Sequence, residues 1–243
     1  MSKLTVVGIG PGNYENMTVR ADLALQECDV IIGYHVYVDL VKERYSDKEF
    51  MTTPMTKEVD RCRLALEEAL KGRNVAMVCS GDSGIYGMAA LIYELRGESA
   101  EPVVDVVPGL TAACSGASLL GAPLTHDFAV VSLSDRLTSW ELIEKRLEAA
   151  AQSDLSIVLY NPASMGRAGY LRRACEILLR HLPEERVCGI SRNIGRDGES
   201  EIVLTLGNLK EFPADMFCTV FIGNSATKVI GGKMVTPRGY RDV

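Results

Sequence analysis

The stretch that decides the fold is LTVVGIGPG at residues 4–12, a short apolar run that ends in a turn containing three glycines. Valine-rich runs bounded by glycine predict a buried strand with a tight turn at its carboxyl end. The pattern recurs in VAMVCSGDSG at residues 75–84 and in VVDVVPGLTAA at residues 103–113. Three strands that each run into a glycine loop predict a ligand site at the carboxyl edge of a sheet.

Apolar runs alternate with amphipathic stretches along the rest of the chain. Six further strands are predicted over residues 30–33, 128–133, 156–160, 187–191, 202–206 and 219–222. Helices are predicted over residues 56–70, from the capping-box sequence TSWE at 138–141 onward, and over 169–182. The first of these helices carries its apolar stripe at Val59, Cys62, Leu66 and Ala69. Strands alternating with helices predict an α/β fold with a largely parallel sheet in at least part of the molecule.

Two α/β lobes are expected, residues 1–115 and 116–243. Before this boundary, four strands carry glycine loops; after it, the chain is richer in arginine and ends in closely spaced strands. We expect each lobe to be a mixed sheet flanked by helices, with a ligand cleft between the lobes.

Composition narrows the class of protein. The chain has 243 residues, 47% of them hydrophobic, and a mean hydropathy of +0.08, which is typical of a folded globular protein. No apolar run approaches the ~20 residues that cross a bilayer, and no basic leader precedes the first strand, so we expect a cytoplasmic protein without a membrane partner. The net charge of −6 disfavours a nucleic acid partner.

Cysteine and histidine usage predicts no metal site. The seven cysteines form no CxxC pair, and most of them lie in apolar runs, which is typical of buried, reduced thiols. The three histidines lie far apart in the sequence.

The first glycine loop departs from the dinucleotide fingerprint. Asn13 stands where the third glycine is required, and Pro11 removes an amide that would face a pyrophosphate. The second strand ends in Gly33-Tyr34 instead of an acidic residue, and no Gly-Lys-Ser/Thr sequence is present. Conventional NAD and ATP sites are therefore disfavoured.

Two loop residues admit a structural as well as a functional interpretation. Asp82 can accept hydrogen bonds from ligand hydroxyl or ammonium groups, or it can cap its own turn. Thr111 can contact a ligand, or it can be the N-cap of the helix that follows.

Taken together, the three loops resemble those of the tetrapyrrole methylase family, a two-lobed class of S-adenosylmethionine-dependent methyltransferases. Seven further segments are similar to the branch of this family that methylates C17 of a tetrapyrrole in cobalamin biosynthesis and contracts the macrocycle. They are GYHVY at 33–37, GMA at 87–89, GAPLTHDF at 121–128, SLSD at 132–135, LYNP at 159–162, GNS at 223–225 and TPRGY at 236–240. One departure is Ser83, where the family more often has proline.

The resemblance implies a role for individual residues. The implied contacts to S-adenosylmethionine, and to S-adenosylhomocysteine as the product, are Pro11, Gly81, Asp82, Ile85, Thr111, Ala112 and Tyr160. The tetrapyrrole would be bound by Tyr34, Tyr37, Arg136, Arg192 and Arg238, with Arg167 and Arg196 as further candidates for its carboxylates. His126, Asp127 and Asp135 would move protons during ring contraction.

Several of these residues also admit a purely structural interpretation. Each arginine can be a solvated surface residue, the two tyrosines can fill the core, and each of the two aspartates can cap a turn. The family also implies a homodimer. Methylation of another corrin carbon, of RNA or of a protein is the alternative within the superfamily, and a non-catalytic tetrapyrrole carrier is the alternative from another class.

Overall fold

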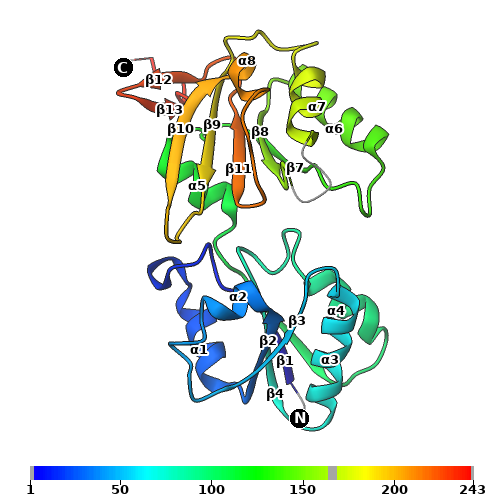
Figure 1. Ribbon diagram of the computed structural model, residues 1–243. Coiled ribbons are helices and arrows are strands. Elements are labelled where there is room, and N and C mark those ends of the chain that lie inside the picture. Colours follow the sequence, from blue (N-terminus) through cyan, green and yellow to red (C-terminus); the bar gives the residue numbers. More distant parts are fainter. Residues whose placement is uncertain (1–2, 164–168, 242–243) are drawn as a thin grey trace. The chain divides into compact units, whose positions relative to one another are not determined.

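The computed structural model describes residues 3–163 and 169–241. The chain divides into two compact units, Met1–Ala112 (unit 1) and Ala113–Val243 (unit 2). Each unit is an α/β structure whose sheet is flanked by helices (Figure 1), so the α/β fold class is confirmed. None of the helices in the described ranges is long and apolar enough to cross a membrane.

Unit 1 is built on a five-stranded sheet with the order β3-β2-β4-β1-β5. Its strands are β1 (Lys3–Gly8), β2 (Val30–Tyr34), β3 (Glu49–Thr53), β4 (Asn74–Cys79) and β5 (Val103–Val107). All four neighbouring pairs are parallel, so the mixed sheet expected for this lobe is wrong in that detail. The reason is that each connection carries a helix that returns the chain to the starting edge.

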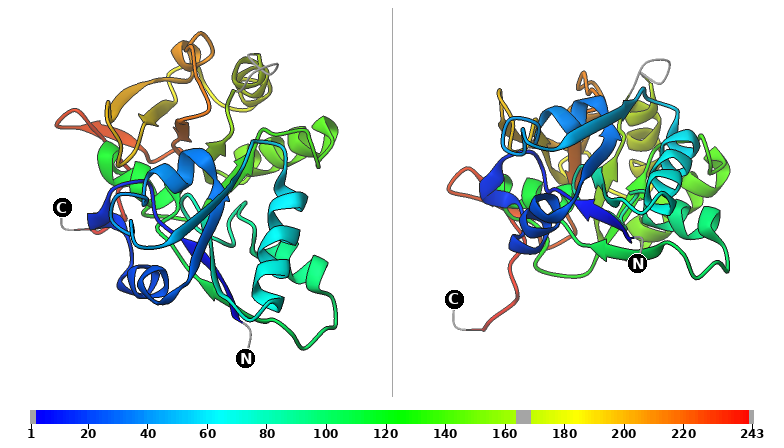
Figure 2. Two further views of the ribbon diagram at one scale, coloured as in Figure 1. Left: turned by 60° about the horizontal axis from the view of Figure 1, so that its bottom comes forward. Right: turned by 90° about the horizontal axis from the view of Figure 1, so that it is seen from below.

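The helices of unit 1 cover both faces of this sheet. They are α1 (Val19–Glu27), α2 (His35–Asp39), α3 (Glu58–Leu70) and α4 (Ala89–Arg96), with a short 3₁₀ turn at Tyr14–Asn16. Leu4 and Val6 of β1 pack with α3 and α4, whereas Val7 packs with α1 and α2. Figures 1 and 2 show α1 on one side of the sheet and the pair of α3 and α4 on the other.

The sequence prediction missed β3, α1, α2 and α4 in unit 1. The β3 sequence, EFMTT, is polar and half exposed at the edge of the sheet, so it lacks a buried strand's apolar pattern. Helix α3 forms as predicted, and Cys62, Leu66 and Ala69 of its predicted apolar stripe are buried. Val59 is the exception at 41% exposed, whereas Arg61 is only 5% exposed.

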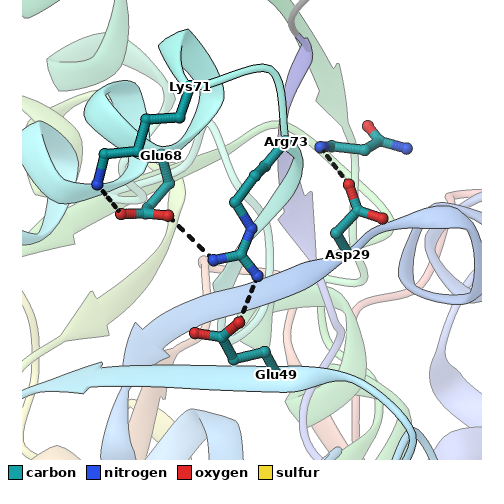
Figure 3. A network of polar contacts seen from close by, with 6 residues as sticks. Asp29, Glu49, Glu68, Lys71 and Arg73 are labelled. Carbon is teal, nitrogen blue, oxygen red and sulfur yellow. Dashed lines mark hydrogen bonds and ion pairs between the residues drawn. The ribbon is translucent and has the colours of Figure 1, made fainter.

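A polar network lies at the amino edge of this sheet (Figure 3). Arg73, just before β4, donates to Glu68 of α3 at 3.0 Å and to Glu49 of β3 at 2.5 Å. Lys71 donates to the other oxygen of Glu68 at 2.6 Å. These two cations hold the pKa of Glu68 below its usual value, so the ion pairs tie the end of α3 to the starts of two strands.

Unit 2 contains a mixed five-stranded sheet with the order β10-β9-β11-β8-β7. Its strands are β7 (Phe128–Ser132), β8 (Ser156–Tyr160), β9 (Val187–Arg192), β10 (Ser200–Thr205) and β11 (Cys218–Ile222). Strands β7 and β8 are parallel, while β11 runs antiparallel to both β8 and β9. A separate small sheet joins β6 (Gly121–Ala122), β12 (Lys228–Ile230) and β13 (Lys233–Val235), which the sequence prediction missed.

Helices of unit 2 also lie on both faces of its sheet. They are α5 (Ala112–Leu120), which begins at the last residue of unit 1, α6 (Trp140–Gln152), α7 (Tyr170–Leu178) and α8 (Leu206–Leu209). The last three pack on one face and α5 on the other, where a Cβ on Gly116 would lie 2.9 Å from the ring of Phe221. Helix α6 is confirmed, but the residue that caps it is Ser139 and not Thr138.

Candidate active site

The three glycine loops meet at the carboxyl edge of the sheet in unit 1. Strands β4, β1 and β5 are neighbours and run parallel, so their loops leave from the same edge, as predicted. Gly10 and Gly81 join two of the loops through a pair of backbone hydrogen bonds, with N···O distances of 3.1 and 2.7 Å.

The strand order reverses at this point. The chain leaves β1 toward α1 on one face of the sheet, and it leaves β4 toward α4 on the opposite face. In open α/β sheets, ligands bind at such a switch point, outside the carboxyl ends of the strands. The topology therefore supports a ligand site at the β1 and β4 loops.

Asp82 connects two of the loops through its carboxylate. One oxygen accepts the amides of Gly84 at 2.8 Å and Ile85 at 3.0 Å, and the other accepts the amide of Gly109 at 2.9 Å. Both oxygens are thus engaged with backbone N–H groups. Asp82 is a cap for its own turn and a link to the loop after β5.

Glycine is required where the loops approach each other. A Cβ on Gly8 would lie 2.6 Å from the nitrogen of Gly109, and a Cβ on Gly109 would lie 2.1 Å from the oxygen of Gly81. Ser83, the departure from the family pattern, is fully buried and donates to the carbonyl of Val107 at 2.9 Å. The serine therefore adds a further link between the same two loops.

The solvent-facing part of the second loop is small and partly apolar. Gly84 is exposed, Ile85 is 43% exposed and Tyr86 is 54% exposed. Tyr86 has a φ of +54°, a backbone conformation that bulky residues rarely adopt and that tends to occur at functional sites. Pro11 and Thr111 are buried beside these loops, whereas Ala112 is half-buried.

Tyr34 and Tyr37 lie at the carboxyl end of β2, hence at the same edge of the sheet. Their rings meet edge to face, with centroids 5.2 Å apart. Both side chains are half-buried, so each keeps an accessible surface.

Unit 2 has its own polar edge at the carboxyl ends of β7, β8 and β9. The hydroxyl of Tyr160 accepts the amide of Ala113 at 2.7 Å, at the start of α5. Asn161 donates to the hydroxyl of Ser132 at 2.9 Å, and Asp135 accepts a hydrogen bond from Tyr170. The predicted segments around Ser132 and Tyr160 are thus brought together.

The predicted catalytic residues do not come together. His126 and Asp127 precede β7, whereas Asp135 follows it, and a five-residue strand spans roughly 17 Å. His126 Nε2 lies 3.1 Å from the carbonyl oxygen of Pro237, and Asp127 holds the amide of Ser156 with its backbone oxygen. His126 and Asp127 therefore lie at one end of β7 and Asp135 lies beyond its other end, and the catalytic role of each stays a prediction.

The predicted arginines are divided in the same way. Arg136 is exposed beyond β7, and Arg192 ends β9, where it pairs with Asp215 at 2.5 Å. Arg238 lies near His126 instead and donates to the carbonyl of Thr125 at 3.0 Å. Of the two further candidates, Arg196 has its Cζ 5.7 Å from the ring centroid of Phe217, and Arg167 lies outside the described residues.

Several family-like segments owe their positions to a buried hydroxyl network in unit 2. Thr236 donates to the carbonyl of Pro123 at 2.7 Å and lies 2.8 Å from the hydroxyl of Thr227. Thr227 in turn donates to Asn224 at 3.1 Å. The network joins the segments 121–128, 223–225 and 236–240 away from the polar edge, which indicates a structural role for them.

Comparison with known proteins agrees with this architecture. The model of the family "Tetrapyrrole (Corrin/Porphyrin) Methylases" matches residues 3–210. A probable cobalt-factor III C(17)-methyltransferase of Salmonella typhimurium is 46% identical over 98% of this chain and 99% of its own length. A relative of the same name from Methanocaldococcus jannaschii is 43% identical, with 98% of each chain covered. The chain spans only 45% of the cobalt-factor III methyltransferase of Priestia megaterium, at 44% identity.

Solved structures are similar over nearly the whole chain. The crystal structure of the methyltransferase CobJ has a TM-score of 0.91 at 36% identity, covering 98% of this chain and 100% of that one. Uroporphyrin-III C-methyltransferase of Thermus thermophilus, complexed with S-adenosylhomocysteine, has a TM-score of 0.70 at 21% identity, covering 91% and 97%. The interlocked loops, the switch point and these matches lead to one conclusion: the chain belongs to the tetrapyrrole (corrin/porphyrin) methylases.

Proposed function

We propose that this chain transfers a methyl group from S-adenosylmethionine to C17 of cobalt-factor III and contracts the macrocycle. The observation that carries the proposal is the end-to-end match at 46% identity to a relative named for that reaction. The relatives with 41–46% identity that bear this name are named for the cobalt-containing substrate, which favours it over metal-free precorrin-3B.

The loops of unit 1 suit the cofactor. S-adenosylmethionine presents an apolar adenine, polar groups that backbone can recognise, and a sulfonium that is already a strong methyl donor. The exposed face of Gly84 and Ile85 offers an apolar contact beside accessible backbone. We keep the seven expected contacts, with one change for Asp82: because three amides occupy its carboxylate, it would act by holding the loops in shape.

The protein's own contribution would be orientation and proton handling. Orienting the donor and acceptor can lower a barrier by about 7–11 kcal/mol in ideal cases. The tyrosine pair at the end of β2 would lie against the macrocycle, and Arg136 and Arg192 would bind its carboxylates. Asp135 is our choice for moving the proton, because it shares its edge of the sheet with Tyr160.

The test is incubation with S-adenosylmethionine and tetrapyrrole, with or without cobalt, followed by mass spectrometry and absorbance. We expect one methyl group to be gained per macrocycle and the ring to contract, faster with the cobalt-loaded substrate. Methylation at another carbon, or consumption of S-adenosylmethionine only with RNA or protein, would refute the proposal. Binding of tetrapyrrole without consumption of the cofactor would point to a carrier.

Variants separate the two proton-handling candidates. Asp135→Asn should slow formation of the contracted product, whereas His126→Ala should leave it intact, because His126 lies at the other end of β7. The reverse result would restore His126 to the mechanism.

The homodimer and the cytoplasmic location implied by the family remain part of the proposal. Analytical ultracentrifugation of the purified chain should give twice its mass of 26.5 kDa, and cell fractionation should recover it with soluble proteins. A monomer, or recovery with membranes, would contradict these two points.

A further inference from the structure

Unit 1 buries an arginine that the sequence reasoning did not single out. Arg61 lies on the inner face of α3 and is only 5% exposed. Its Nε donates to the hydroxyl of Thr53 at 2.9 Å, and its Nη2 donates to the carbonyl of Pro54 at 3.1 Å. Two hydrogen bonds therefore hold the guanidinium group against the end of β3.

Arg61 has no anionic partner among the residues that the structure describes. Both of its hydrogen-bond acceptors are neutral, and no carboxylate of that part of the chain lies within 4.0 Å of it. Glu68, buried on the same helix, is paired twice. A buried charge without a counter-ion is costly, so an unpaired one indicates a ligand that completes the site.

One nitrogen of the group remains available. Nη1 of Arg61 makes no hydrogen bond within the described ranges, and it is not among the buried nitrogen atoms that lack a partner. Nη1 is therefore not completely buried, and it has two N–H donors to offer.

The position of Arg61 relates it to the candidate site. Its Cζ lies 5.9 Å from the ring centroid of Tyr34 at the end of β2, and Thr53 ends β3, so the group is at the edge that carries the glycine loops. The adjoining loop contains Met55, 41% exposed, and Thr56 with a φ of +71°. A β-branched residue in this conformation is an outlier of the kind found at functional sites.

We propose that Arg61 binds a carboxylate of the tetrapyrrole, with Nη1 donating to the carboxylate oxygen while the ring of Tyr34 contacts the macrocycle. This inference rests on the proposed function, because that function supplies a polycarboxylate substrate. A guanidinium group fits this role because it stays charged when buried and its other nitrogens are already fixed.

The test measures binding separately from catalysis. Uroporphyrin III, a polycarboxylate macrocycle, is titrated by absorbance against the full chain, and S-adenosylmethionine binding is measured by calorimetry as a check on folding. Arg61→Gln should bind the porphyrin about 10- to 100-fold more weakly, since one charge-assisted hydrogen bond is lost. Arg63→Gln removes the same charge from the exposed face of α3 and should bind like the parent.

The outcomes separate this inference from the proposed function. Equal porphyrin affinity for Arg61→Gln and the parent overturns the inference even if the parent methylates its substrate, and so does a parent that binds no porphyrin. A parent that binds porphyrin but does not methylate refutes the proposed function alone. If Arg61→Gln fails to bind S-adenosylmethionine and is therefore misfolded, Arg61→Lys is measured instead. Weaker porphyrin binding by Arg61→Lys than by the parent supports the role of Arg61, because lysine lacks the planar fork of donors. Porphyrin affinity equal to that of the parent refutes it.

Discussion

Replacement of Asp82 tests whether its carboxylate holds the glycine loops together. Asp82→Ala removes the acceptor for three backbone amides, two in its own loop and that of Gly109 in the next. Asp82→Asn keeps one oxygen but sets an NH₂ group against an N–H donor. If the amide oxygen stays on the Gly84 side, the asparagine loses only the link between the loops.

The expected loss of stability follows from these contacts. Hydrogen bonds to a charged group contribute about 1.5–3 kcal/mol each, but water can replace the exposed one at Gly84, and coupled bonds do not add. We therefore expect Asp82→Ala to lower the free energy of unfolding by about 2–4 kcal/mol. For a chain of this size, that lowers the Tm by roughly 5–15 °C. The Tm of Asp82→Asn should lie between those of Asp82→Ala and the parent.

Thermal melting followed by circular dichroism measures this loss, and calorimetry with S-adenosylmethionine measures the effect on the cofactor. Asp47→Ala is the matched control, because the Asp47 side chain is 73% exposed and pairs with its neighbour Lys48 at 3.2 Å. An Asp82→Ala protein with the Tm of the parent would refute the anchoring role. If its cofactor affinity also fell, Asp82 would be a direct contact instead.

Three further predictions concern other parts of the chain. Gly109→Ala should give little folded protein, because its Cβ would lie 2.1 Å from the oxygen of Gly81. Gly169→Ala is the control: its Cβ would meet no atom of the described residues within 4 Å, so the variant should express like the parent and melt within a few degrees of it, the small loss being that of the helix N-cap. Equal yields of Gly109→Ala and the parent would contradict the close approach of the loops. The pKa of Glu68 is lowered in the folded state, so its contribution to stability is present above the unfolded pKa and is lost as the pH falls through the folded pKa. The urea midpoint of the parent should therefore drop on acidification below about pH 4.5, and that of Glu68→Gln should drop less steeply. Parallel plots of urea midpoint against pH for the two proteins would count against this role. Ellman's reagent should label one thiol of the native protein, Cys114, because the other six are buried with raised pKa values; rapid labelling of several would show that they are accessible.

Local patterns were sufficient for the elements with strong signals. Strands β1, β4 and β5 are short apolar runs rich in valine that end at glycine loops, so they could be predicted from local sequence alone. Parallel pairing then required their loops to share one edge. The polar edge strand β3 carries no such signal, and an arginine in an amphipathic helix is ordinarily exposed. Neither β3 nor the burial of Arg61 could therefore be predicted.

The family-like motifs single out segments whose functional roles stay a prediction, and they do not predict at which edge of the sheet each segment lies. The segments around His126 and Asp135 are close in sequence, yet β7 separates them by its full length, because a strand carries its two ends apart. Conversely, Thr236 and Pro123 are far apart in the chain and share a hydrogen bond.

The sequence by itself determined the α/β class, the three glycine loops and the edge at which they gather, because strand composition and turn residues act locally. Only the tertiary structure decided what the carboxylate of Asp82 binds and that Arg61 is buried without a counter-ion. Both depend on contacts between residues distant in the chain, such as Asp82 with Gly109, and no local pattern encodes them.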